Sequence, residues 1–283
     1  MEIINTVPAM TAWSNQRIKA GASIALIPTM GCLHEGHQAL INEAARRADE
    51  VVVSIFVNPL QFGPNEDFSR YPRPFDNDCA ILSALKTSVL FAPEAQLFYP
   101  EGFTTSVAVQ GLTDGLCGAT RPGHFTGVTT VVAKLFNSVK PTVALFGKKD
   151  LQQLAAIKAM VRDLNFDIDI IGHPIVRDAD GLALSSRNRY LTITERSSAL
   201  CLTKAMTSAR QWVTQGMTDC CIILDRLRDQ ITTDPAVTID YLTIVQESNL
   251  APQTKTDHQS ILAMAIKIGS TRLIDNDHLI PEE

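Results

Sequence analysis

The stretch "IPTMGCLHEGHQALI" (Ile27–Ile41) joins a strand-like run to a helix-like run through a glycine turn. The strand-like run stops at Pro28, and two of the six histidines, His34 and His37, then follow three residues apart with a glycine between them. A strand, a tight turn and a helix in this order predict the first half of an α/β unit, with both histidines on the first turn of the helix.

The same alternation of strand-like and helix-like segments continues beyond this stretch. Apolar, β-branched runs lie at Ser23–Pro28, Val51–Val57, Ser88–Pro93, Thr142–Gly147 and Phe166–Gly172. Helix-like segments lie at Glu35–Ala48, Phe75–Lys86, Gly127–Val139 and Asp150–Leu164. Continuously apolar strands indicate a parallel sheet that is covered on both faces. We therefore expect an α/β fold with a Rossmann-like parallel sheet.

The last third of the chain has a different pattern. One helix is expected over Tyr190–Val213, with Thr192 and Glu195 as a capping box, and a second over Ile223–Ile231. Strand-like runs follow at Ile239–Gln246 and Ile261–Gly269. Helices followed by strands without crossovers predict a smaller α+β domain. We place the N-terminal domain at residues 1–174 and the C-terminal domain at 175–283.

Composition narrows the class of protein. The formal net charge of −5 argues against a general nucleic-acid-binding protein. The N-terminal residues lack the pattern of a signal peptide, and no apolar run is long enough to span a membrane. The six cysteines are scattered without a CxxC pair, which is typical of reduced thiols in a cytoplasmic protein.

The loops that follow the strands carry the polar groups from which a site can be built. A parallel sheet binds ligands at the carboxyl ends of its strands, and the first such loop holds the two histidines. A helix N-terminus favours an anion through its unpaired N–H groups, and Gly31 and Gly36 would let a ligand approach the backbone. Histidines there can donate hydrogen bonds to phosphate oxygens. Spacing suggests no third metal ligand, so we expect no metal site built by the protein.

A second polar loop, "LALSSRN" (Leu182–Asn188), lies after the last strand of the first domain. Taken alone, this segment would be interpreted as a polar loop before a helix. An isolated histidine pair would likewise be interpreted as two ordinary polar residues at the start of an amphipathic helix. The motif H-x-G-H resembles the HIGH motif of the nucleotidylyltransferase and class I aminoacyl-tRNA synthetase superfamily, which also uses a serine-containing basic loop on the triphosphate. The two loops together favour a phosphate-binding function.

The order of several motifs makes the resemblance closer. "PTMGCLHEGH", "SIFVNPLQF", "RYPR", "RPGHFTGV", "LFGKKDLQQL" and "DGLALSSRN" follow one another between Pro28 and Asn188, and "RLIDN" (Arg272–Asn276) lies near the end of the chain. Together they resemble the pantoate–β-alanine ligase family. The resemblance implies ATP-dependent joining of D-pantoate to β-alanine through a pantoyl adenylate, with pyrophosphate and AMP as the other products. It also implies Mg²⁺ with ATP and a homodimer.

The resemblance also implies which residues do this. His34, His37, Lys149 and Arg187 would be catalytic, with His37 stabilising charge on the α-phosphate or on departing pyrophosphate. Gln61 and Gln153 would bind pantoate, and Gln61 would also meet β-alanine. The expected ATP-binding residues are Met30, Gly31, Cys32, Leu33, His34, Glu35, Gly36, His37, Gly147, Lys148, Lys149, Asp150, Val176, Leu184, Ser185, Ser186 and Arg187.

Several points stay open at the level of sequence. Asp150 could bind the ribose or cap its helix, and Arg121 and His124 could face the substrate channel or pack a loop. Lys148 replaces a glutamate and Glu35 an aspartate that are common in the family.

Three other functions fit the sequence less well. A nucleotidylyltransferase for another acceptor would not explain the two glutamines. A tRNA synthetase would need an anticodon-binding domain, which is not evident in the sequence. A nucleotide sensor without catalysis would not need the four expected catalytic residues together.

Overall fold

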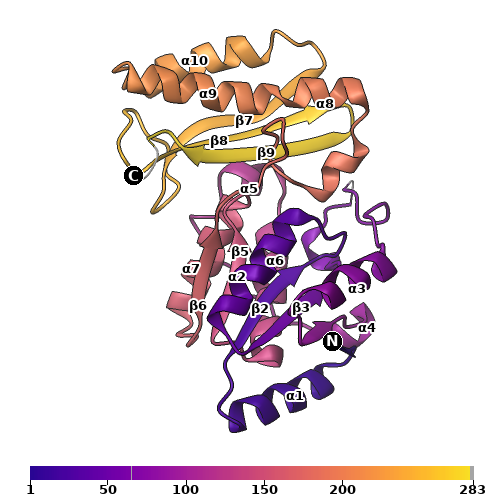
Figure 1. Cartoon of the computed structure of the whole chain (residues 1–283). Coiled ribbons are helices and arrows are strands. Elements are labelled where there is room, and N and C mark those ends of the chain that lie inside the picture. Colours follow the sequence, from indigo (N-terminus) through magenta and orange to yellow (C-terminus); the bar gives the residue numbers. More distant parts are fainter. Residues whose placement is uncertain (65, 281–283) are drawn as a thin grey trace. The chain divides into compact units, whose positions relative to one another are not determined.

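The computed structural model describes residues 1–64 and 66–280, and it divides the chain into two compact units, Met1–Pro174 and Ile175–Glu283. Figure 1 shows the helices and strands of both units. Among the described residues, no helix has the length and apolar character needed to cross a membrane.

The first unit contains a sheet in which all strand pairs are parallel. In sheet order, its strands are β1 (Glu2–Ile4), β4 (Val89–Phe91), β3 (Glu50–Ile55), β2 (Ile24–Thr29), β5 (Val143–Gly147) and β6 (Asp169–His173). The predicted Rossmann-like sheet is therefore confirmed. Because the chain places β3 and β4 on one side of β2 and then β5 and β6 on the other, the order reverses between β2 and β5.

Helices cover both faces of this sheet, as continuously apolar strands require. The helices of the unit are α1 (Val7–Lys19), α2 (Glu35–Arg47), α3 (Phe75–Ala84), α4 (Ala95–Phe98), α5 (Leu116–Thr120), α6 (His124–Val139) and α7 (Leu151–Asp163), with the 3-10 helix η1 (Pro59–Gln61). Alternate residues of β2 enter different cores: Ile24 and Leu26 pack with α1, α6 and α7, whereas Ala25 and Ile27 pack with α2 and α3. The result is a three-layer arrangement.

Two elements at the N-terminus were not predicted. Strand β1 has only three residues and pairs at the edge of the sheet with β4. Helix α1 buries only Met10, Trp13 and Ser14, so its sequence carries little helical periodicity. Its stability comes from packing against α6 and the apolar core, which a local pattern does not reveal.

Pro28 helps to open the sheet at the point where the strand order reverses. Strand β2 pairs with β3 up to Thr29 but with β5 only up to Leu26. The Ile24 carbonyl accepts from the Thr142 N–H on the β5 side. Alternate residues of a strand point their polar groups to the same neighbour, so position 28 also faces β5, where proline has no N–H to donate. The strands separate there and leave room for the loops that follow.

The second unit is an α+β structure, as predicted. Its antiparallel sheet consists of β7 (Val237–Gln246), β8 (Ser260–Ile268) and β9 (Thr271–His278). Its helices are η2 (Ser186–Tyr190), α8 (Ile193–Ala199), α9 (Cys201–Thr214) and α10 (Cys220–Ile231). Figure 1 shows α9 and α10 along one face of the sheet, where they form an apolar core with β7 and β8.

The C-terminal expectations need two corrections. The single helix expected over Tyr190–Val213 is divided, because α8 ends at Ala199 and α9 begins at Cys201. The Thr192–Glu195 capping box is present, but it caps the short α8. Strand β9 was not predicted, since its polar residues "TRLIDNDH" alternate with few apolar ones.

Candidate active site

The loop after β2 is held by side chains at every amide from Gly31 to His34. Gly31 N–H donates to Thr29 Oγ1 at 3.1 Å, and the N–H groups of Cys32 and Leu33 each donate to a carboxylate oxygen of Asp78 at 2.8 Å. His34 N–H donates to His37 Nδ1 at 3.3 Å. These four donors are therefore already used within the protein.

The amides of this turn therefore bind groups of the protein itself, and they precede the first turn of α2, to which the expected anion-binding N–H groups belong. Cys32 and Leu33 are buried and use their amides on Asp78, so they shape the loop. The shape of the turn also requires a glycine at position 31. Its φ is +80°, and a Cβ there would lie 3.0 Å from Asp78 Oδ2 and from Ile55 Cγ2.

Sequence reasoning missed Asp78, which belongs to α3 and is 1% exposed. Asp78 shares one face of α3 with Leu82, which is also buried, because four residues separate them. A carboxylate on a buried helix face needs partners. The partners are 46 and 45 residues away in the chain, so the sequence did not identify them.

His34 and His37 lie side by side at the start of α2, with ring centroids 4.0 Å apart. Burial, together with the charges of His34 and Lys149, lowers the pKa of His37 to about 3. His37 is therefore neutral at pH 7. Because its Nδ1 accepts the His34 amide, the neutral ring carries its proton on Nε2. The geometry makes His37 a neutral hydrogen-bond donor.

The segment Gly147–Asp150 joins β5 to α7 across the point where the strand order reverses. Lys149 acts electrostatically on His37, so the loops after β2 and β5 are close enough to share one site. The stem of Lys148 packs over Gly172 of β6, where a Cβ would lie 3.3 Å from Lys148 Cγ. Asp150 precedes α7 without a capping hydrogen bond from its side chain, so the capping interpretation is wrong.

Gln61 is the last residue of η1 and lies beside the loop that follows β2. Its side-chain Nε2 donates to the sulfur of Met30 at 3.2 Å, and its Oε1 accepts from Asn58 Nδ2 at 3.0 Å. Asn58 also donates to the carbonyl of Gly127 in α6 at 3.0 Å. Helix α6 comes very close here, since a Cβ on Gly127 would lie 2.3 Å from the carbonyl oxygen of Leu60. The predicted pantoate residue is thus fixed by contacts on both sides.

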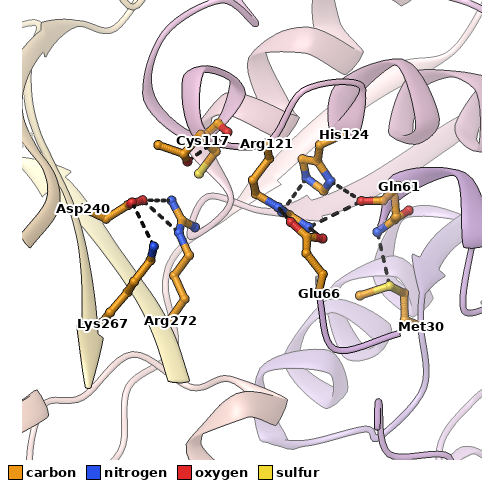
Figure 2. A network of polar contacts seen from close by, with 10 residues as sticks. Met30, Gln61, Glu66, Cys117, Arg121, His124, Asp240, Lys267 and Arg272 are labelled. Atoms are coloured by element: carbon orange, nitrogen blue, oxygen red, sulfur yellow. Dashed lines mark hydrogen bonds and ion pairs between the residues drawn. The ribbon is translucent and has the colours of Figure 1, made fainter. Parts of the chain in front are cut away.

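Arg121 and His124 support the main chain of Gln61, as Figure 2 shows. His124 Nδ1 donates to the Gln61 carbonyl at 2.8 Å, and Arg121 donates to His124 Nε2 at 2.9 Å. Arg121 also forms an ion pair with Glu66, with Nε and Oε1 2.6 Å apart. Burial, together with the charge of Arg121, lowers the pKa of His124 to about 4, so this histidine is neutral. These contacts give both residues the loop-packing role that was left open.

Gln152 and Gln153 begin α7 in different surroundings. Gln152 is buried, and its Nε2 donates to the carbonyls of Leu112 and Gly115 at 2.9 and 2.7 Å. Gln153 is only partly buried. The structure therefore distinguishes Gln152, which anchors a loop, from its partly exposed neighbour Gln153.

In the second unit, the residues expected to bind ATP lie on a hairpin and the turn that follows it. Leu184 N–H donates to the Val176 carbonyl at 3.0 Å, and Ser185 Oγ accepts from Arg187 N–H at 3.3 Å. The hairpin is anchored by Arg177, whose guanidinium binds both carboxylate oxygens of buried Asp275 at 2.7 and 3.0 Å. The Val176 carbonyl therefore already accepts one hydrogen bond within the protein. Arg187 lies in the turn that follows the hairpin.

The fold and these loops define the class of α/β proteins that bind a ligand where the strand order of a parallel sheet reverses. Comparisons with known proteins identify the family. The family model for pantoate–β-alanine ligase matches residues 2–278. The chain is 51% identical over 276 residues to the pantothenate synthetase of Geobacter sulfurreducens, and the alignment covers 98% of each chain.

Solved structures agree with this result. The crystal structure of pantothenate synthetase from Thermus thermophilus matches with a TM-score of 0.94 and 43% identity, over 99% of this chain and 100% of that chain. The pantoate–β-alanine ligase from Francisella tularensis, solved with βγ ATP and β-alanine, matches with a TM-score of 0.79 and 33% identity, over 99% and 98%. The chain belongs to the pantoate–β-alanine ligase family. It is a ligase of pantothenate biosynthesis that forms an amide bond, as the sequence predicted.

Proposed function

We propose that the enzyme works through a pantoyl adenylate. A carboxylate oxygen of D-pantoate attacks the α-phosphorus of ATP, and the bond from that phosphorus to the bridging oxygen of pyrophosphate breaks. The amine of β-alanine then attacks the acyl carbon and AMP leaves. The observation that carries this proposal is the neutral His37 on the first turn of α2. It lies beside His34 and within reach of the Lys149 charge, and it follows the loop whose Met30 contacts Gln61.

The electrostatic problem in the first step is that two anions must meet. We propose that His34, His37, Lys149 and Arg187 reduce this repulsion. His37 contributes its Nε2–H to an oxygen of the α-phosphate or of departing pyrophosphate, while the cationic side chains spread positive potential over the chain of phosphates. Because this donor is neutral, the enzyme avoids the free-energy cost of holding a charge in a partly buried site before ATP binds.

We propose the following contacts for ATP. The residues of Met30–His37 line the phosphates, with the histidine rings and the amides of Glu35 and Gly36 in contact and Gly31–Leu33 in support. Gly147–Asp150 lie at the phosphates and ribose, with Asp150 on the ribose. In the second unit, Val176 meets adenine through its main chain, and Leu184–Arg187 form the second phosphate-binding segment. This is the serine-containing loop that accompanies a HIGH-type motif.

For the acceptor, we propose that Gln61 and Gln153 bind pantoate and that Gln61 also meets β-alanine. An amide can donate and accept, which suits a ligand with hydroxyl and carboxylate groups. Support comes from the fixed position of Gln61 and from the partial exposure of Gln153.

We propose that Mg²⁺ enters with ATP. No group of three His, Cys, Asp or Glu side chains suited to a metal ion occurs in the described part of the chain. Mg²⁺ commonly takes its ligands from phosphates and water, and the proposed site supplies phosphates. When bound, the ion neutralises charge on the phosphate oxygens.

We further propose a cytoplasmic homodimer. All six cysteines are free thiols in the structure, which suits a reducing compartment. The dimer, formed through the first unit, is what the family resemblance implies. Light scattering after gel filtration measures the oligomeric state, and a monomer at micromolar concentration would contradict this part of the proposal.

The deciding experiment is ATP–pyrophosphate exchange with Mg²⁺, measured with and without D-pantoate and without β-alanine. We expect exchange that requires pantoate, followed by release of AMP when β-alanine is added. A folded, ATP-binding protein that shows no exchange would support a sensor or a different acceptor. His37→Ala should lower the exchange rate without unfolding the protein, and wild-type exchange in that variant would remove His37 from the mechanism.

A further inference from the structure

The turn after β2 is built around a carboxylate that comes from inside the protein. Gly31 and Cys32 both have positive φ, +80° and +53°, which turns successive amides toward one point. In many phosphate-binding loops such converging amides meet the ligand. Here the amides of Cys32 and Leu33 each bind one oxygen of Asp78, at 2.8 Å.

The fit around this carboxylate is close. Asp78 is 1% exposed, and a Cβ on Gly31 would already be 3.0 Å from Oδ2. Both carboxylate oxygens bind the turn, so the side chain restrains it at two points. His34, the N-cap of α2, follows the turn directly, and His37 lies on the first turn of that helix. The orientation of the histidine pair therefore depends on how the turn is held.

We propose that Asp78 is a positioning residue of the ligase. Its carboxylate occupies the amide pair that another protein would offer to a phosphate, and it thereby fixes the direction in which His34 and His37 meet ATP. Side chains, rather than these two amides, then bind the phosphates. The inference rests on the proposed roles of the two histidines and adds a residue to which neither the motifs nor the family comparisons assign a role.

Chemical rescue tests this proposal. Asp78→Ala removes the carboxylate and leaves a space of matching size, into which formate can bind and restore both hydrogen bonds. We expect pantoate-dependent ATP–pyrophosphate exchange to fall about 100-fold, as a displacement of about 1 Å in a catalytic group does. Formate should restore a large part of this loss, and chloride at the same ionic strength should not.

Asp76→Ala is the matched control, because Asp76 lies on the first turn of the same helix and is exposed. This variant and the wild type should keep full activity and show no gain with formate. If the wild type itself shows no exchange, the proposed function fails. If the wild type is active and Asp78→Ala is equally active, or is folded and weak but does not respond to formate, the positioning role fails.

Asp78→Asn decides the matter where the alanine variant does not fold. Asparagine keeps the size of the side chain but points an N–H group at one of the two amides. We expect a kcat about tenfold lower, a pantoate KM changed by less than about twofold, and no rescue by formate, because the space is filled. A folded Asp78→Asn variant with wild-type kcat would overturn the proposal.

Discussion

Replacing Gly127 with alanine tests how α6 places Gln61, the glutamine that we propose binds pantoate. The new Cβ would lie 2.3 Å from the carbonyl oxygen of Leu60, 2.5 Å from its carbonyl carbon and 2.7 Å from the backbone nitrogen of Gln61. Non-bonded heavy atoms rest at about 3.5 Å. The backbone of η1 must therefore move away from α6 by about 1 Å, and Gln61 moves with it.

The two consequences of this displacement differ in size. Overpacking costs about 1–3 kcal/mol, while alanine in place of glycine within a helix returns up to about 1 kcal/mol. We expect the melting temperature to fall by about 2–4 °C for each kcal/mol of net loss. The effect on function is larger, because a shift of about 1 Å at a positioning group can cost up to about 100-fold. The pantoate KM should rise by about tenfold or more.

The assay is release of AMP at saturating ATP and β-alanine with pantoate varied, repeated with ATP varied. We expect the ATP KM to stay within about twofold of wild type, since the displacement acts on the segment that we propose binds pantoate. Gly115→Ala is the control, because a Cβ there meets nothing within 4 Å. A Gly127→Ala enzyme with wild-type pantoate KM and melting temperature would show that the close approach of α6 does not place Gln61.

Four further predictions concern single groups. The free energy of unfolding should fall as the pH drops from about 6.5 to about 4, because burial lowers the pKa of His124 to about 4 and the unfolded chain then binds the proton first. In urea titrations, His124 should contribute a change of about 1.4 kcal/mol per pH unit to the free energy of unfolding. The same pH dependence in His124→Gln as in the wild type would refute this prediction. ATP binding at pH 5 should be accompanied by proton uptake, because the phosphates raise the lowered pKa of His37. Calorimetry in buffers of different ionisation enthalpy measures the number of protons taken up. Equal proton uptake by His37→Gln would contradict this prediction. Gln153→Ala should raise the pantoate KM more than the ATP KM in steady-state kinetics, and the reverse order would place this residue at the nucleotide. Arg177→Met should cost about 3–5 kcal/mol in urea unfolding, because it leaves the buried Asp275 carboxylate unpaired, and a loss below about 1 kcal/mol would refute this.

The parallel sheet could be predicted because its signals are local. Strands such as β2 and β3 are continuous apolar runs, and α7 shows helical spacing, so each could be recognised within a short window. The division between α8 and α9 is also local but depends on the geometry of one junction residue, Leu200, which no periodicity reveals. Strand β9 forms because β8 offers it a partner along its whole length.

The sequence by itself determined the position of the histidine motif, the order of the loops and the family. These follow from residue types and spacings along the chain. Only the tertiary structure decided how the site is held, because Asp78 binds amides 46 and 45 residues away and His124 binds a carbonyl 63 residues away. It also decided the charge of His37, since the pKa of an imidazole depends on its burial and on neighbouring charges, which exist only after the loops of β2 and β5 have come together.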